Sequence, residues 1–319
     1  MRLPTLDQLQ KSADIVYRSM QPTPQYSWPL LSARVGTEVW VKHENHTPVG
    51  AFKVRGGLVY FHELVQAGTR PAGVISATRG NHGQSIAFAA RQHDIPVTIV
   101  VPMGNSREKN EAMRALGARL VEHGNDFQEA REHAQVLADA ERLHMVSSFH
   151  PFLVRGVASY SLELLHAVPN LDVLYVPIGL GSGICGAVAA REALGRTTEI
   201  VGVCSTEAPA YARSFEYKES VERPAKTQIA DGLACRVPEK SALETIWQHV
   251  ARIVEVTDEE ITDAMRLVFS TTHNVAEGAG AAAVAAAMKE RHDLVGRKVG
   301  VVLSGENVDR EAYARVLAG

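Results

Sequence analysis

Short runs of apolar and β-branched residues alternate with longer helical stretches along the chain, and this alternation restricts the fold more than any other feature. Several of the runs are apolar at consecutive positions, as in parallel strands that are buried on both faces. Strands are expected at Glu38–Val41, Gly73–Ser76, Val97–Val101, Ala118–Val121, Val173–Val176, Ile200–Val203, Arg252–Val256 and Val299–Leu303. Strand–helix alternation of this kind predicts an α/β architecture.

The stretches between these runs have helix-forming compositions. Gln84–His93 follows a glycine turn, and Arg107–Leu116 and Asp126–Leu143 are rich in helix formers and charged residues. Thr257 and Glu260 have the spacing of a capping box, which predicts that a helix starts there.

A length of 319 residues fits one or two domains, and the expected strands fall into two blocks along the chain. Residues 73–146 hold three of the strands with their helices, and we expect them to form a small domain. Residues 1–72 plus 147–319 would then form a second, larger sheet. The hydrophobic fraction of 45% and the charged fraction of 22% are near the globular average, so the chain can build a sizeable core.

Charge and hydropathy argue against several classes of partner. The formal net charge is −3 and no basic stripe is present, which argues against nucleic acid. No signal-peptide core follows Met1, and the most apolar helical run, Gly278–Met288, is too short to span a membrane. Cys185, Cys204 and Cys235 are far apart and odd in number, as expected of reduced thiols. We therefore expect a soluble, cytoplasmic protein with no membrane or nucleic-acid partner.

Lys53 is the first candidate for chemistry. It directly follows Phe52, and it lies between a Pro-Val-Gly turn and a glycine pair. Such a layout is typical of a lysine held by its backbone rather than extended into solvent. Burial disfavours the ammonium form and lowers the pKa of a lysine, and the free amine can then attack a carbonyl. The alternative interpretation is an ordinary solvated lysine.

A second candidate is the turn from Thr78 to His82, which leaves a strand and enters a helix. Glycines flank Asn81 and His82, and the helix start presents free backbone amides that bind carboxylate or phosphate. Arg79 adds a fixed fork of donors for a carboxylate. The alternative is an ordinary strand–helix turn with an exposed arginine.

The third candidate is a glycine-rich loop after the strand at Val173–Val176. Its residues are Gly179, Leu180, Gly181, Ser182 and Gly183, followed by an Ala-rich helix. Glycines let a backbone approach a phosphate, and a serine adds a hydroxyl. Gly181-x-Gly183-x-x-Gly186 also satisfies the dinucleotide fingerprint, with Glu207 near the position of a ribose-binding carboxylate. The loop alone therefore leaves a nicotinamide-dependent dehydrogenase open.

The fourth candidate is Ser304, at the carboxyl end of the strand at Val299–Leu303, where α/β proteins bind ligands. Its alternative interpretation is a C-terminal turn. The histidines at positions 43, 46, 82 and 150 lack the tight spacing of metal ligands, so no metal centre is expected.

Taken in order along the chain, these four segments resemble the fold-type II enzymes that use pyridoxal 5′-phosphate (PLP), in particular the threonine/serine dehydratase and serine racemase group. Thr227–Ala234 and Glu277–Ala281 also look like two stretches of that group, so the resemblance covers nearly the whole chain. It implies a two-domain α/β fold like that of the tryptophan synthase β chain, each domain a mainly parallel sheet flanked by helices. Residues 1–72 plus 147–319 would be the cofactor-binding domain, and residues 73–146 the substrate-binding domain.

The resemblance also implies a role for each candidate residue. Lys53 would form the Schiff base, Phe52 would pack on the pyridine ring, and Asn81 would bond the ring hydroxyl. Ser304 would face the pyridine nitrogen. The loop from Gly179 to Gly183 would hold the phosphate, and the substrate carboxylate would be bound by Thr78, Arg79, Gly80, Asn81 and His82. The implied activity is a homodimeric ammonia-lyase that removes the hydroxyl group of a β-hydroxy-α-amino acid of the L-threonine or L-serine type, giving a 2-oxo acid and ammonia.

Two departures from the family pattern bear on this prediction. Arg79 stands where the family has Ser or Ala, and serine racemases use that serine as an acid/base. Arginine is a poor proton shuttle, so a racemase is the less favoured alternative. Arg79 could instead select 3-hydroxyaspartate through its second carboxylate, or 3-phenylserine by stacking. Arg213 stands where serine racemases have an Asp that binds a divalent metal together with Glu207, so we expect no metal requirement.

Overall fold

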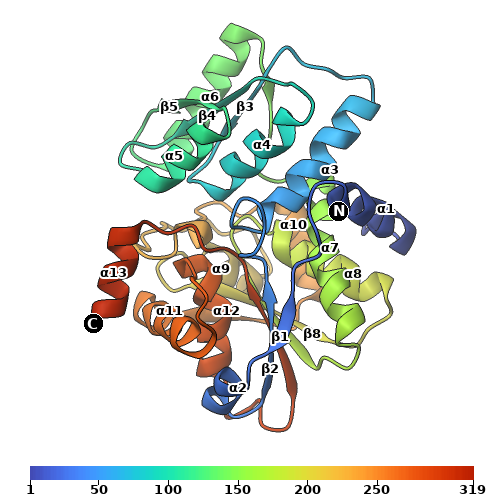
Figure 1. The fold of residues 1–319 in the computed structure, drawn as a ribbon, viewed down its shortest axis with the longest axis vertical. Coiled ribbons are helices and arrows are strands. Elements are labelled where there is room, and N and C mark those ends of the chain that lie inside the picture. The colour runs from blue at the N-terminus through green and yellow to red at the C-terminus, as the bar shows by residue number, and fades with distance from the viewer.

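The computed structural model describes residues 1–319 and contains two separate sheets with helices on their faces (Figure 1). The first sheet has six strands, in the order β1 (Gln25–Ser27), β2 (Glu38–His43), β10 (Lys298–Leu303), β7 (Val173–Pro177), β8 (Glu199–Ser205) and β9 (Arg252–Val256). Its neighbouring strands are parallel except for the pair β1–β2. β10, the strand that ends just before Ser304, therefore lies in the interior of the sheet.

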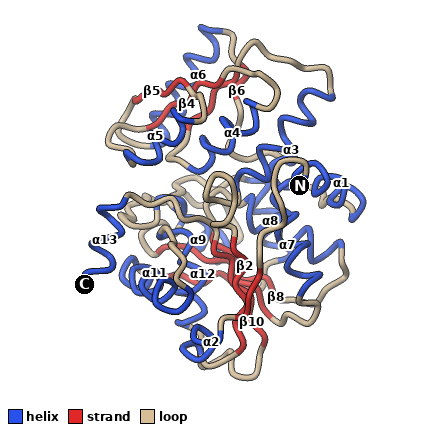
Figure 2. Tube along the Cα trace, in the orientation of Figure 1, coloured by secondary structure: helices blue, strands red, loops and turns tan.

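The second sheet has four parallel strands, in the order β5 (Arg119–Glu122), β4 (Val97–Val101), β3 (Val74–Ala77) and β6 (His144–Met145). The two sheets appear as separate groups of strands in the tube view (Figure 2). β3 and β4 are buried at every position, because helices cover both faces of this sheet. The predicted α/β architecture with mainly parallel sheets is confirmed.

Helices fill the connections between the strands, as right-handed crossovers require. They are α1 (Leu6–Tyr17), α2 (Pro29–Val35), α3 (Lys53–Gln66), α4 (Asn81–Arg91), α5 (Arg107–Ala115), α6 (Phe127–Glu141), α7 (Pro151–Ala167), α8 (Ser182–Ala193), α9 (Ala210–Tyr217), α10 (Lys240–His249), α11 (Asp258–Thr272), α12 (Gly278–Lys289) and α13 (Arg310–Ala318), with one 3₁₀ turn, η1 (Asp231–Leu233). α12 is largely alanine and is buried on nearly all sides, since small side chains let it pack closely on the strands of the larger sheet. The capping box expected at Thr257 and Glu260 is confirmed at the start of α11.

α3 lies at the junction between the two blocks (Figure 1). Its residues Val54, Leu58 and Phe61 share one buried cluster with α4 and with β3 and β4. The same helix also packs on α7, and a Cβ at Gly56 would lie only 2.9 Å from the carbonyl oxygen of Leu153. Because α3 belongs to both packing units, the domain boundary proposed at residues 72 and 73 stays a prediction.

All eight predicted strands are present, with ends that differ by up to two residues from those expected. Sequence reasoning missed β1 and β6, which have only three and two residues and so show no apolar period. It also placed the start of α4 three residues late. Asn81, His82 and Gly83 are helical and form its first turn. No helix of the structure has both the length and the hydropathy needed to span a bilayer.

Candidate active site

Four chain segments meet around Lys53: the first turns of α3, α4 and α8, and the end of β10. The Nζ atom of Lys53 donates to Oγ of Ser182 over 3.1 Å, which joins α3 to the glycine loop. The backbone N–H of Phe52 donates to the carbonyl oxygen of Ser304 over 3.1 Å. The structure thus brings together three of the four segments that the sequence singled out, and His82 of the fourth lies close enough to feel the charge of Lys53.

Lys53 is the first residue of α3 and is half-buried. Burial lowers the pKa of its ammonium group to about 8. Oγ of Ser85 donates to the carbonyl oxygen of Lys53 over 2.6 Å, and the Lys53 amine lies 4.9 Å from the centroid of the Phe52 ring. The ring of Phe52 packs edge-on against Tyr160. The backbone of Lys53 is therefore fixed, and its ammonium group can lose its proton at a pH near 8.

The glycine loop (Gly179–Gly183) leads from β7 into α8. The backbone amides of Ser182, Gly183 and Ile184, in the first turn of α8, donate no hydrogen bond within the protein. Gly181 has φ +95°, and a Cβ there would lie 2.6 Å from the Cβ of Ala242, so only glycine fits. Such a helix start with free amides is suited to a phosphate.

The α4 turn (Thr78–His82) has two buried polar atoms without a partner. Nε of Arg79 and Nε2 of His82 make no hydrogen bond, although both atoms are inaccessible to solvent. Burial, with the nearby charge of Lys53, lowers the pKa of His82 to about 3, so its ring is neutral. Oγ1 of Thr78 accepts from the N–H of Gly80 over 2.9 Å and shapes the turn. Unpaired buried polar atoms at a helix start are expected where a ligand completes the hydrogen bonding.

Asn81 joins the α4 turn to the large sheet. Its Nδ2 atom donates to Oε1 of Glu277 over 2.5 Å, and its Oδ1 atom accepts from Nδ2 of Asn307 over 2.9 Å. Ser304 is buried at the end of β10, where its hydroxyl donates over 3.4 Å to the carbonyl oxygen of Ala279. Both predicted cofactor contacts therefore lie in the same part of the molecule as Lys53, and their roles remain proposals.

Four charged side chains, Lys42, Glu44, Arg55 and Glu163, form a buried cluster at the start of α3, which we call the α3 anchor. Arg55 is fully buried, and its Nε donates to Glu44 over 2.6 Å while its Nη1 donates to Glu163 over 2.6 Å. Lys42, also fully buried, donates to Glu163 over 2.5 Å. Two cations thus face two carboxylates, and one of these cations, Arg55, lies two residues after Lys53 in the chain.

Sequence reasoning missed several residues of this site. Tyr160 lies against Phe52 and donates to the carbonyl oxygen of Gly183 over 3.2 Å. Lys109 of α5 lies 2.8 Å from Asp231 and 3.0 Å from Glu277. Their partners are distant in sequence, so no local pattern marks them.

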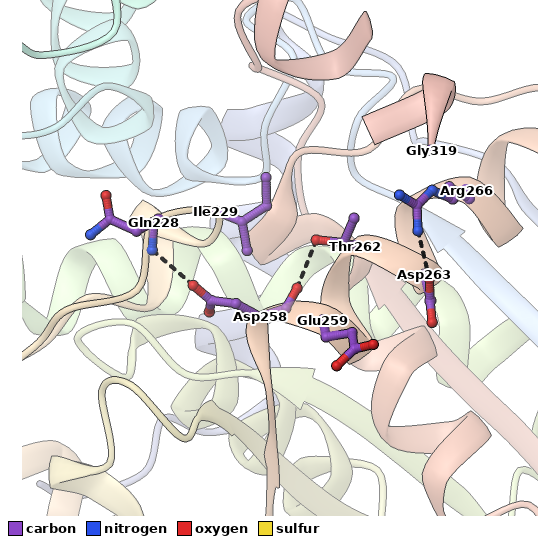
Figure 3. A pocket seen from close by; sticks show the side chains of 8 residues that line it. All are labelled: Gln228, Ile229, Asp258, Glu259, Thr262, Asp263, Arg266 and Gly319. Carbon is purple, nitrogen blue, oxygen red and sulfur yellow. Dashed lines mark hydrogen bonds and ion pairs between the residues drawn. The ribbon is translucent and has the colours of Figure 1, made fainter. Parts of the chain in front are cut away.

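Two other regions carry clusters of charged side chains. A cavity of 500 Å³ is lined by Gln228, Ile229, Asp258, Glu259, Thr262, Asp263, Arg266 and Gly319 (Figure 3). Asp258 already accepts from the N–H of Gln228, and Arg266 is paired with Asp263, and no buried polar atom of this cavity lacks a partner, in contrast to the α4 turn. At the position where the resemblance to serine racemases implied a metal ligand, Arg213 pairs with Glu216 and Glu255, and Glu207 is exposed.

Comparison with known proteins agrees with this geometry. Residues 16–305 match the family model described as pyridoxal-phosphate dependent enzyme. The L-threonine ammonia-lyase of Thermotoga maritima is 33% identical over 289 residues, covering 90% of this chain and 72% of the relative. The L-threo-3-hydroxyaspartate ammonia-lyase of a Pseudomonas species is 30% identical over 320 residues, covering 100% of each. The structure of maize serine racemase has a TM-score of 0.90 at 25% identity, over 99% of this chain and 98% of that one.

These matches resolve the choice that the glycine fingerprint left open between a dinucleotide and PLP. A family model spanning residues 16–305 covers the α3, α4 and α8 turns and the end of β10 together, whereas the fingerprint concerned a single loop. The chain belongs to the family of pyridoxal-phosphate dependent enzymes.

Proposed function

We propose that this enzyme is a PLP-dependent dehydratase (ammonia-lyase) that converts a β-hydroxy-α-amino acid to a 2-oxo acid and ammonia. The observation that carries the proposal is the meeting of a desolvated lysine, an anion-binding helix start and a second helix start with unpaired buried polar atoms. Relatives that cover most or all of this chain are named as ammonia-lyases of hydroxy amino acids.

The residues present fit the cofactor. Free amides at the start of α8 and the close backbone approach at Gly181 suit its phosphate. The amine of Lys53 is within reach of this loop, as its contact with Ser182 demonstrates. Phe52 would flank the ring, Asn81 would contact its hydroxyl and Ser304 its nitrogen. When bound, PLP supplies an electron sink for the electrons released at the substrate Cα.

The side chains of this enzyme then have separate tasks. The helix start of α4 binds and orients the α-carboxylate, and the neutral ring of His82 supplies a further polar contact. Lys53 has a pKa of about 8, so its free amine is available near neutral pH and can take the proton from Cα. Ser304 offers a hydroxyl rather than a carboxylate, so it would not hold the ring nitrogen protonated, and the ring would withdraw electrons from Cα less strongly. This would favour prompt departure of the β-hydroxyl group, which would leave as water with the proton that Lys53 took from Cα. Water would then hydrolyse the resulting enamine to the 2-oxo acid and ammonia.

Racemisation is the alternative within the family, and Arg79 argues against it. A racemase needs a second group that returns a proton on the opposite face, and a guanidinium does not give up its proton in proteins. Arg79 has no hydrogen-bond or ion-pair partner, and its buried Nε atom needs an acceptor. An acidic substrate side chain supplies that acceptor, whereas the edge of an aromatic ring does not. The unpaired Nε therefore favours 3-hydroxyaspartate over 3-phenylserine as the preferred substrate.

Spectroscopy and product analysis test the reaction type. We expect a near-visible band for the protein with PLP, its loss on borohydride reduction, and the cofactor mass on the peptide that contains Lys53. With L-serine or L-threonine as the substrate, one 2-oxo acid should form for each ammonia released. Lys53→Ala should reduce the rate of this reaction by about 10⁴-fold. Absence of the band after PLP addition, or D-serine as the main product, would overturn the proposal.

A substrate panel tests the role of Arg79. For Arg79→Ala we expect kcat/KM for 3-hydroxyaspartate to fall about 10- to 100-fold, since a charge-assisted hydrogen bond is lost. Values for L-serine should change little, and this substrate serves as the internal control. Equal changes for 3-hydroxyaspartate, 3-phenylserine and L-serine would show that Arg79 does not select the side chain.

We also infer a cytoplasmic homodimer. Leu30 of α2, Phe269 of α11 and Leu317 of α13 are exposed apolar side chains on three helices, of which α11 packs on the other two. A second copy that covers these side chains would give a dimer mass in light scattering, and a Phe269→Glu variant should shift it toward the monomer.

A further inference from the structure

Lys109 belongs to the smaller block and forms ion pairs with two carboxylates of the larger block. It lies in the first turn of α5, is buried, and its Nζ atom lies 2.8 Å from Asp231 of η1 and 3.0 Å from Glu277 at the start of α12. Its aliphatic stem packs directly on Gly80 of the α4 turn, where any Cβ would overlap it. Lys109 also lines a cavity of 360 Å³ together with Asn307.

The carboxylate of Glu277 fixes the amide of Asn81. A carboxylate only accepts hydrogen bonds, so the Nδ2 side of the Asn81 amide must face Glu277. Asn307 donates to the other side, to Oδ1, while its remaining N–H donates to the carbonyl oxygen of Val49 over 2.8 Å. One N–H of Asn81 is left for a ligand.

This orientation depends on the ionisation of Glu277. Its carboxyl group is buried, and burial, helped by the charge of Asp231, raises its pKa above the usual value, while the charge of Lys109 opposes this rise. If Glu277 were protonated, the charge-assisted hydrogen bond from Nδ2 of Asn81 would be lost, and only the contact from Asn307 would still hold the Asn81 amide. Asp231 is less buried and can satisfy its charge with water.

We propose that Lys109 is a positioning residue that keeps Glu277 ionised and thereby aims the free N–H of Asn81 at the cofactor. The proposal rests on the proposed function only in assigning that N–H to the ring hydroxyl of PLP. It adds a residue from α5 to the site, joined to Asn81 through a carboxylate 168 residues away in sequence.

The first test is the ionisation of Glu277 in the protein without PLP, which does not depend on activity. The infrared difference spectrum between wild type and Glu277→Gln should show an ionised carboxylate at neutral pH. The same difference measured in a Lys109→Met background should show a protonated carboxyl group. A carboxylate that stays ionised without Lys109 would overturn the proposal.

The second test uses the affinity for PLP and the kinetic constants. Lys109→Met should weaken PLP binding and lower kcat by about tenfold each, the worth of one hydrogen bond, with KM changed less than about threefold. The double variant Lys109→Met/Glu277→Gln should regain most of both, because the carboxamide oxygen accepts from Asn81 without needing a cation. If the double variant stays as weak as Lys109→Met, Lys109 acts by packing on Gly80 and the proposal fails.

A matched control separates this role from a general link between the blocks. Asp309 also joins the larger block to α5, accepting from Oγ of Ser106 over 2.5 Å and from the N–H of Glu108 over 3.2 Å, but it does not contact Asn81. Asp309→Asn should leave PLP affinity near the wild-type value, and an equal loss in this variant would overturn the proposal. Lys109→Gln, polar but uncharged, repeats the test if Lys109→Met does not fold. If the wild type shows no PLP band, the proposed function fails, and the infrared test still decides on Lys109.

Discussion

The α3 anchor and the α4 turn both lie close to Lys53, and they differ in how completely their polar atoms are paired. In the anchor, Nε, Nη1 and Nη2 of Arg55 all donate to carboxylate or hydroxyl oxygens, and no polar atom of the four charged side chains is left unpaired. In the turn, Nε of Arg79 and Nε2 of His82 are buried without a partner.

This difference separates support from recognition. Buried charges that are fully paired to one another fix a backbone, here the first turn of α3. Buried donors with no partner carry a desolvation penalty that a ligand can remove. The anchor is therefore expected to control stability, and the turn to control substrate binding, although both contain an arginine.

The largest expected effect is on the anchor. Arg55→Met leaves Glu44 and Glu163 buried with less compensation, and the free energy of unfolding should fall by about 3–5 kcal/mol. Chemical denaturation of the protein without PLP measures it. A loss below about 1 kcal/mol would show that the anchor is not the rigid support described here.

The second largest expected effect is the loss of stability in acid, which differs between the α4 turn and the α3 anchor. His82 has a pKa of about 3 when folded, while an unfolded histidine takes up a proton below pH 6.5. Stability should therefore fall as the pH drops from 6.5 toward 3, by up to about 1.4 kcal/mol per pH unit for this residue alone. In the anchor, burial raises the pKa of Glu163, but Arg55 and Lys42 outweigh it and lower the pKa below its usual value of 4.5. The stability that Glu163 contributes is therefore kept above pH 4.5 and is lost only in stronger acid.

The His82→Gln variant isolates the contribution of the turn. Unfolding free energies of the wild type and this variant, both without PLP, are compared between pH 6.5 and 4.5. Other buried histidines, such as His43, titrate equally in both proteins and cancel. A pH dependence that is identical in the two proteins would contradict the buried, neutral His82.

Arg79→Met should have a much smaller effect on stability than Arg55→Met. The guanidinium of Arg79 has no partner to lose, and its buried Nε atom carries a desolvation penalty, so the free energy of unfolding should not fall by more than about 0.5 kcal/mol. The same denaturation experiment measures it. A loss comparable with that of Arg55→Met would remove the distinction between the two arginines.

The sequence was informative where a signal is local. Buried strands such as Val97–Val101 appear as continuous apolar runs, and the glycine loop follows such a strand directly. β6 has two residues and depends on its pairing with β3, so its sequence carries no period of its own. The start of α4 was placed late because Gly80 and Gly83 look like turn residues, whereas Gly83 is helical and packs tightly against Met113 and Ile99.

The paired charges could not be predicted for a different reason. Arg55 lies between apolar residues and a glycine pair, and no local sequence pattern predicts that its side chain is buried, because its partner Glu163 is 108 residues away. The link from Lys109 to Glu277 spans 168 residues. Tertiary packing alone determines which charges are buried and paired, and only the structure shows it.

The smallest effect is expected where Arg213 replaces a metal ligand of the family pattern. Its guanidinium is paired with Glu216 and Glu255, each over 3.0 Å, as the anchor charges are paired with one another. A built-in cation repels a divalent metal ion, so activity after chelation and after added magnesium should stay within about twofold of the starting value. Arg213→Asp is the matched variant, since it places a second carboxylate near Glu207. Magnesium should raise the melting temperature of Arg213→Asp and leave that of the wild type unchanged. Clear activation of the chelated wild type by magnesium would show that a paired arginine does not exclude metal from this site. The difference between paired and unpaired charges would then predict function only around Lys53.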